Sequence, residues 1–167
     1  APCGIARELV EASDVLGADQ SLRRRVSFVG IDLDDEPLGL SRRLAGVRAG
    51  FRFVQGDVFD RASYPERPDP DVIVSAGLAD FLDDAAAVRF FATCRAALKP
   101  GGLLVTSAQR PQRLADYLMR ELAELRPTYR DAEQISAVLR GAGFTGMTAV
   151  PDHVGYQTLV TARAPTR

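Results

Sequence analysis

The feature that most constrains the fold is a regular alternation of helix-type and strand-type segments. Apolar side chains recur at helical spacing in residues 5–16, 36–47, 80–102, 112–125 and 131–144. Short runs rich in β-branched and aromatic residues lie between or after them, at 26–34, 51–60, 71–78, 103–109, 146–152 and 156–164. This alternation predicts an α/β fold, a mostly parallel sheet with helices on both faces. The apolar run at 71–78 is typical of a strand that is buried on both faces.

The two ends of the series differ from a plain alternation. The last two strand-type segments are joined by the short loop 152–155, which predicts an antiparallel strand at one edge. The series begins with a helix, and the chain lacks an initial methionine. We therefore expect residues 1–167 to form a single domain, cut at its N-terminus from a longer chain just after the first strand of the sheet.

Composition excludes several classes of function. Apolar residues make up 46% and charged residues 26% of the 167, as in ordinary globular domains. The formal net charge of −1 provides no basic field that would attract nucleic acid or an anionic membrane. No apolar run approaches the roughly 18 residues of a spanning helix, and no signal peptide is evident. We expect a cytoplasmic protein that acts on a small-molecule substrate, without nucleic acid or membrane partners.

Cysteine and histidine are too few to build a metal site. Cys3 and Cys94 form no spaced cluster, and His153 is the single histidine. We therefore expect no metal. Both cysteines are interpreted as small core thiols rather than nucleophiles, and His153 as a solvated loop residue.

Small and acidic residues follow the predicted strands, where ligands bind in an open parallel sheet. The turn Pro2-Cys3-Gly4 leads into a helix whose N-terminal N–H groups can hold an anionic or zwitterionic group. Asp32 ends a strand where a carboxylate can accept both hydroxyls of a ribose. Gly56-Asp57-Val58 offers a carboxylate for an exocyclic amine and an N–H for a ring nitrogen. With the small residues Ser75-Ala76-Gly77, these ends can hold an adenosine with a polar tail.

A known family combines these features. The segments GIDLD, FVQGDVFD, DVIVSAGLADFLDD, AALKPGGLLVTS and AEQISAVLRGAGF, in this order, resemble a class I S-adenosylmethionine-dependent methyltransferase. The resemblance extends over nearly the whole chain. It implies a Rossmann-like three-layer α/β/α sandwich with strand order 3-2-1-4-5-7-6, in which strand 7 is antiparallel and the first strand lies outside this segment. It also implies methyl transfer from S-adenosyl-L-methionine, with S-adenosyl-L-homocysteine as the product.

The resemblance also implies roles for residues at the adenosine end of the cofactor. Asp32 would bind the ribose hydroxyls, and Leu33 beside it belongs to the same cofactor-binding set. Asp57 would bind the adenine amine, and the Val58 N–H would meet an adenine ring nitrogen. The alternative makes Asp32 a helix cap or turn carboxylate, and Asp57 a turn residue. We also expect the Asp32 carboxylate to lie outside the core.

At the methionine end, the resemblance places Ser75 beside the cofactor and packs Cys3 and Gly4 against it. Here the chain departs from the family pattern G-x-G-x-G, because residues 2–6 read Pro-Cys-Gly-Ile-Ala and retain only the middle glycine. Pro2 has no N–H to donate, and Ala6 adds a methyl where the backbone approaches closely. Arg7 either pairs with the cofactor carboxylate or lies on the surface.

Catalysis needs no conspicuous residue, because a sulfonium carries its own leaving group and a base is required only when the nucleophile must lose a proton. We assign no catalytic residue, and Tyr129 is either a lid residue or a ring that covers the end of the sheet. Two alternatives stay open. One is a degenerate relative that only binds, or transfers a different group. The other is an NAD-dependent oxidoreductase, which the absence of GxGxxG disfavours.

Overall fold

The computed structural model describes residues 3–16, 26–66 and 68–166. The chain divides into two compact units, Ala1–Tyr64 and Pro65–Arg167, and each is described by itself. The predicted role of Pro2 falls outside the described residues. The single-domain organisation stays a prediction.

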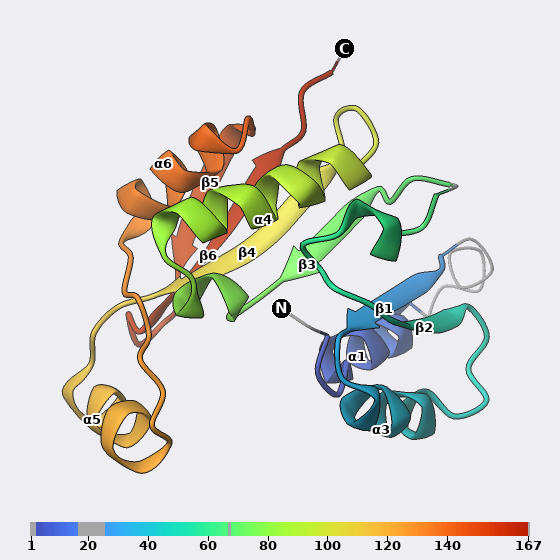
Figure 1. The fold of residues 1–167 in the computed structure, drawn as a ribbon, viewed down its shortest axis with the longest axis horizontal. Helices are drawn as coiled ribbons and strands as arrows, with labels where there is room; N and C mark the ends of the chain where they lie inside the picture. Colours follow the sequence, from blue (N-terminus) through green and yellow to red (C-terminus); the bar gives the residue numbers. More distant parts are fainter. Residues whose placement is uncertain (1–2, 17–25, 67, 167) are drawn as a thin grey trace. The chain divides into compact units, whose positions relative to one another are not determined.

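The first unit contains a pair of parallel strands and two helices (Figure 1). Its elements are α1 (Arg7–Leu16), β1 (Phe28–Asp32), α3 (Asp35–Ala45), β2 (Phe51–Gln55) and the 3₁₀ turn η1 (Arg61–Ser63). The strands run in register from Phe28 beside Phe51 to Asp32 beside Gln55. Helix α3 packs on both strands and contacts α1.

A glycine in the middle of β1 makes the packing of the first unit possible. Gly30 pairs with Phe53 across the strands. A Cβ atom at Gly30 would lie 2.8 Å from Cδ1 of Phe53 and 2.9 Å from Sγ of Cys3. The phenylalanine ring and the thiol therefore occupy the space that any larger side chain would need.

Gly30→Ala should lower the free energy of unfolding by about 1–3 kcal/mol, because an added methyl overpacks this contact. Gly39→Ala is the matched control, since a Cβ there would meet no atom closer than Nη1 of Arg43 at 3.7 Å. In the helix α3 this second change should stabilise by about 0.5–1 kcal/mol. Chemical denaturation of both variants checks the prediction, and equal effects would contradict the packing described for Gly30.

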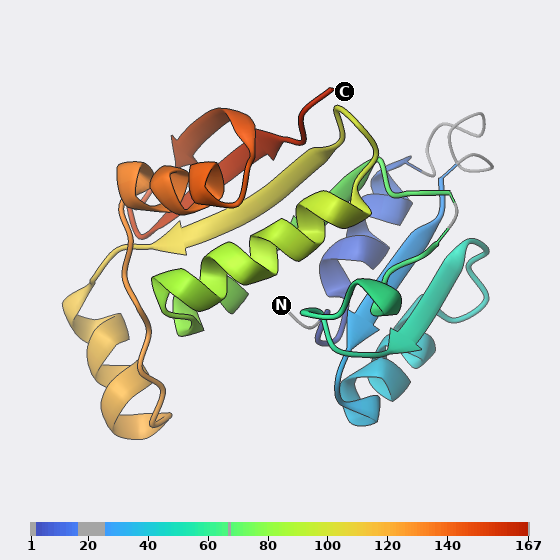
Figure 2. The same cartoon turned by 45° about the horizontal axis from the view of Figure 1, so that its top comes forward.

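The second unit contains a four-stranded mixed sheet, with strands β3 (Val72–Ser75), β4 (Leu103–Gln109), β5 (Thr145–Pro151) and β6 (Gln157–Arg163). The strand order is β3-β4-β6-β5. Strand β3 is parallel to β4, whereas β6 is antiparallel to both β4 and β5. The helices α4 (Asp84–Ala97) and α6 (Ala132–Gly141) contact each other and cover the same face of this sheet (Figures 1 and 2).

Helix α4 follows the sequence pattern closely. The Asp83 side chain accepts a hydrogen bond of 2.7 Å from the Ala86 N–H and caps the helix. The helix buries its own side chains Phe90, Phe91 and Cys94. The interpretation of Cys94 as a core thiol is therefore confirmed. The α/β class and the antiparallel strand near the edge are confirmed as well. The complete strand order and the three-layer arrangement stay predictions.

Two expectations about the second unit are wrong. Strand β3 is not buried on both faces, because Val72 and Val74 are about half exposed. Residues 112–125 do not form one long helix: the five-residue helix α5 (Arg113–Tyr117) passes into the π-type turn η3 (Leu118–Leu122). Neither element buries a residue, so tertiary packing does not stabilise a longer regular helix there.

Within the described ranges, no helix combines the length and the apolar character that crossing a membrane requires. The cytoplasmic location stays a prediction.

Candidate functional site

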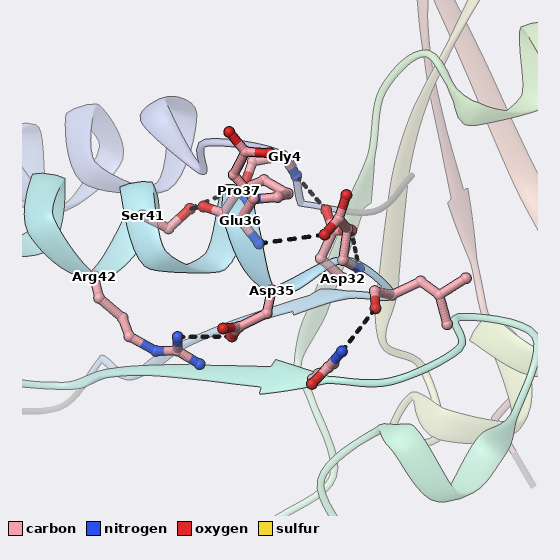
Figure 3. Close-up of polar contacts among 10 residues, drawn as sticks. Gly4, Asp32, Asp35, Glu36, Pro37, Ser41 and Arg42 are labelled. Atoms are coloured by element: carbon pink, nitrogen blue, oxygen red, sulfur yellow. Dashed lines mark hydrogen bonds and ion pairs between the residues drawn. The ribbon is translucent and has the colours of Figure 1, made fainter.

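The Asp32 carboxylate is the centre of the candidate site in the first unit (Figure 3). The Gly4 N–H donates to its Oδ2 atom at 2.9 Å, and the Asp34 N–H donates to its Oδ1 atom at 3.0 Å. Asp32 is only 4% exposed. The expectation that this residue lies outside the core is therefore wrong, because its charge is offset by two backbone donors at the end of β1.

Backbone hydrogen bonds bring three segment ends together around Asp32. The Cys3 N–H donates to the Ile31 carbonyl, and the Gly56 N–H donates to the Asp32 carbonyl, both at 2.8 Å. From α3, the buried Ser41 hydroxyl lies 2.9 Å from the Gly4 carbonyl oxygen (Figure 3). The turn before α1, the end of β1 and the turn after β2 are thus fixed to one another.

The turn before α1 uses its own N–H groups within the protein. Cys3 and Gly4 donate as described, and the Ala6 N–H donates to the Cys3 carbonyl at 2.9 Å. These three N–H groups therefore have partners inside the protein, and the binding of the cofactor by Cys3 and Gly4 stays a prediction.

Ala6 takes up a glycine-type conformation in this turn. Its φ is +47° and Gly4 has φ +53°. A left-handed conformation costs a residue with a side chain about 1–2 kcal/mol. The Ala6 methyl is buried, so packing holds this residue in place despite backbone strain.

The Cys3 thiol is protonated at neutral pH. Burial, and next the negative charge of Asp32, raise the pKa of Cys3 to about 11. Its Sγ lies 3.6 Å from the Gly4 carbonyl oxygen, to which it donates. These surroundings make Cys3 a poor nucleophile.

The residues predicted for adenine lie after β2 in the same unit. Asp57 is exposed, and its Oδ1 accepts a 2.9 Å hydrogen bond from the Phe59 N–H, as in a turn. The Val58 carbonyl accepts a 2.9 Å hydrogen bond from the Tyr64 hydroxyl. The Leu33 side chain is exposed, while its carbonyl accepts from Nε2 of Gln55 at 3.1 Å. Asp57 therefore shapes its own loop and keeps its carboxylate at the surface.

Ser75 lies in the second unit, so the structure describes it apart from the other six predicted residues. It is buried at the end of β3, and its carbonyl accepts a 2.7 Å hydrogen bond from the Thr106 hydroxyl. Two residues later, the Gly77 N–H donates to the Ser107 hydroxyl at 3.1 Å. Hydroxyl side chains of β4 thus fix the loop that follows β3.

Sequence reasoning missed two buried charged residues in the second unit. Asp80 in η2 (Leu78–Phe81) is 1% exposed and Arg130 is 3% exposed. Burial raises the pKa of Asp80 to about 6, although the Gln109 N–H and the Arg130 charge oppose this shift. Both residues stand near other charged residues, in ADFLDD and PTYRD, and a charged side chain is ordinarily exposed, so the sequence alone predicts exposure for them.

Arg130 clamps its own segment onto η2 and the start of α4. Its guanidinium donates to the carbonyls of Ala79 at 2.6 Å and Leu82 at 2.7 Å. It also forms an ion pair of 2.8 Å with Asp84. The connection before α6 is thereby fixed beside the loop that follows β3.

Tyr129 was predicted to be a lid residue or a covering ring. Its hydroxyl donates to Oδ1 of Asp116 in α5 at 2.6 Å, and Nε of Arg120 donates to the same atom at 2.7 Å. Burial, together with Asp116, raises the pKa of Tyr129 to about 12, so the hydroxyl stays protonated. In this structure Tyr129 therefore braces α5.

The remaining candidates lie at the surface. Arg7 and His153 are exposed. Within the ranges that the structure describes, no three or more His, Cys, Asp or Glu side chains are grouped so that they could hold a metal ion.

Comparison with known proteins gives one family and several solved structures of similar fold. A family profile described as methyltransferase domain matches residues 6–102. No curated protein sequence matches the chain. The structure of a possible exported protein from Bordetella parapertussis is similar, with TM-score 0.82 and 30% sequence identity, over 99% of this chain and 60% of that one.

Two further structures share the fold at lower identity. Human N-acetylserotonin methyltransferase, in complex with S-adenosylmethionine, has TM-score 0.68 and 17% identity over 87% of this chain and 43% of that one. An O-methyltransferase family protein from Burkholderia thailandensis has TM-score 0.72 and 15% identity over 99% and 49%. The chain thus spans between two fifths and three fifths of the length of these proteins.

Proposed function

Because the chain belongs to the methyltransferase-domain family, we propose that it binds S-adenosyl-L-methionine and transfers a methyl group to a small-molecule acceptor. When bound, this cofactor supplies an activated methyl group together with its own leaving group. The protein's part is then to hold the adenosine, to orient the acceptor and to receive a proton where the acceptor carries one.

The observation that carries the proposal is the Asp32 carboxylate at the end of β1. A carboxylate has about four acceptor positions, and the N–H groups of Gly4 and Asp34 use two of them. The remaining lone pairs suit the two hydroxyls of a ribose. Asp57, exposed after the neighbouring strand, is an acceptor of the kind that an adenine amine requires. These two hydrogen-bond acceptors therefore fit the adenosine end of the cofactor.

The proposal that the acceptor is a small molecule is supported by the net charge of the chain. The net charge of −1 gives no general attraction to nucleic acid or to an anionic membrane. We therefore propose a small molecule as substrate and leave the acceptor atom open.

A second candidate is a relative that binds the cofactor without transferring methyl. It is favoured by the internal use of the Cys3, Gly4 and Ala6 N–H groups, which removes donors from the amino-acid end of the ligand. In that case adenosine binding would persist while methyl transfer would be absent.

Asp32→Asn should weaken the binding of S-adenosylhomocysteine by about 10–100-fold. A hydrogen bond to a charged group contributes about 1.5–3 kcal/mol, and each 1.4 kcal/mol is about tenfold in affinity. Isothermal titration of the full chain measures the change, with circular dichroism to check folding. The control is Asp35→Asn, which alters an exposed carboxylate in the first turn of α3 that pairs with Arg42 of the same helix.

Since Asp32 also supports the fold, a second test changes the ligand and leaves the protein unaltered. The wild-type protein should bind 5′-methylthioadenosine more tightly than its 2′,3′-dideoxy analogue by a similar factor. Equal affinities of the two nucleosides, or an Asp32→Asn variant that folds and binds as tightly as the wild type, would contradict the assignment of Asp32 to the ribose.

A further inference from the structure

Asp80 occupies the end of the second unit's sheet at which ligands bind in parallel α/β folds. Strands β3 and β4 are parallel and end at Ser75 and Gln109, and η2 begins three residues after Ser75. The Gln109 N–H donates to Oδ1 of Asp80 at 3.3 Å. One carboxylate oxygen is thus fixed by the last residue of β4.

The other oxygen of Asp80 has no hydrogen-bond partner within the described part of the chain. Such an orphaned carboxylate oxygen is costly in a residue that is 1% exposed, and a native protein retains one where it has a use. The neighbouring cation is Arg130, whose N–H groups are directed to the Ala79 and Leu82 carbonyls and to Asp84. Arg130 therefore offsets part of the charge of Asp80 without occupying Oδ2.

The surroundings also adjust the basicity of Asp80. Burial raises its pKa to about 6, against the opposing effects of the Gln109 N–H and of Arg130. A carboxylate of this kind is mostly deprotonated at neutral pH, and it is a stronger base than an exposed aspartate. General bases work best when their pKa lies near the working pH.

The segment that covers Asp80 is connected to loosely packed helices. The Thr128 N–H donates to the Asp80 carbonyl, and Arg130 follows two residues later. Towards the N-terminus this segment continues into η3 and α5, which bury no residue. Elements with so few buried contacts open at low free energy, whereas Arg130 stays bonded to η2 and α4, so we expect a ligand to approach Asp80 from the side of α5 and η3.

We propose that Asp80 is the acceptor-side base, and that the acceptor is a hydroxyl or an amine whose hydrogen is received by Oδ2. This inference rests on the proposed function. In the step, a lone pair of the acceptor oxygen or nitrogen forms the new bond to the methyl carbon. The carbon–sulfur bond breaks and its electron pair goes to sulfur, which becomes a neutral thioether. The acceptor proton passes to Asp80.

The test follows the transfer of tritiated methyl from S-adenosylmethionine to phenol, catechol, tyramine and benzylamine by the full chain. Asp80→Asn should reduce the rate with the best acceptor by about 10²–10⁴-fold, with unchanged affinity for S-adenosylhomocysteine. Asp71→Asn is the matched control, since it removes an exposed carboxylate just before β3 that pairs with Lys99. Its rate should equal that of the wild type.

A pH profile separates a base from a structural support, and the profile of the wild type does not depend on the folding of any variant. The wild-type rate should rise with pH and level off above about pH 6, and the residual rate of Asp80→Asn should lack this inflection. An Asp80→Asn variant with the wild-type rate, a wild-type profile without the inflection, or no transfer to any of the four acceptors would overturn the inference. If the inference fails but the wild type still binds S-adenosylhomocysteine, the proposed function is unaffected. If the wild type does not bind S-adenosylhomocysteine, the proposed function itself is contradicted.

Discussion

Arg130→Met should lower the free energy of unfolding by about 3–5 kcal/mol, the largest effect that we expect from a single substitution in this protein. The guanidinium is 3% exposed and donates to the Ala79 and Leu82 carbonyls as well as to Asp84. Methionine fills much of the volume but donates nothing. Each carbonyl then loses a charged donor, a hydrogen bond that contributes about 1.5–3 kcal/mol.

Urea denaturation at neutral pH, followed by circular dichroism, measures this change. Arg42→Met is the control, because Arg42 pairs with Asp35 in an exposed ion pair on α3. Such pairs contribute about 0–1 kcal/mol. Similar losses in the two variants would show that the buried clamp described for Arg130 does not form.

The second large effect concerns the pH dependence that Asp80 gives to folding. Its pKa is raised from 3.8 to about 6 in the folded protein. Between these values the folded state binds more protons than the unfolded state, so the free energy of unfolding falls as pH rises. The contribution is complete below about pH 4 and lost above about pH 6. At about 1.36 kcal/mol for each pKa unit, it amounts to about 2–3 kcal/mol.

Asp80→Asn isolates this contribution, because asparagine is neutral at every pH. From about pH 4 to about pH 7, the wild type should lose about 2–3 kcal/mol of stability relative to the variant. Taking the difference between the two proteins cancels the titration of all other groups. A difference that does not change with pH, or that grows in favour of the wild type, would show that burial does not raise this pKa.

The sequence was sufficient for the elements whose local pattern agrees with their packing. Helix α4 lies inside the segment 80–102 for which the spacing predicts a helix, begins after the Asp83 cap and buries Phe90, Phe91 and Cys94. The parallel strands and the antiparallel β6 also follow from short apolar runs and their order. In α4 the apolar side chains that define the pattern are the ones that are buried, whereas β3 takes its predicted place without being buried on both faces.

The predictions from sequence are wrong where the structure of a segment depends on contacts with residues distant in sequence. The apolar residues of 112–125 predict a long helix, yet none of the residues from Arg113 to Leu122 is buried, and the helix changes to a π-type turn at Leu118. Asp32 reads as a surface turn residue, and its burial depends on an N–H from Gly4, 28 residues away. Asp80 and Arg130 stand in polar stretches, and only the folded chain buries them.

For the candidate site, the sequence was sufficient to locate the strand ends and the acidic side chains. It did not indicate that the backbone N–H groups of the turn before α1 donate to other groups of the protein. Cys3, Gly4, Asp32 and Leu33 do come together in the first unit. Hydrogen-bond partners of backbone groups in a turn depend on its φ and ψ angles, and the left-handed angles of Gly4 and Ala6 were not deducible from the residues alone. The internal donors of this turn therefore became visible only in the structure.

Calorimetric titration of the full chain with S-adenosylmethionine, S-adenosylhomocysteine and NAD⁺ tests the central claim most directly. The account predicts saturable binding of both sulfur ligands at one site, weakened by Asp32→Asn, and no binding of NAD⁺. Binding of NAD⁺ in preference to the sulfur ligands, or binding of none of the three, would contradict it.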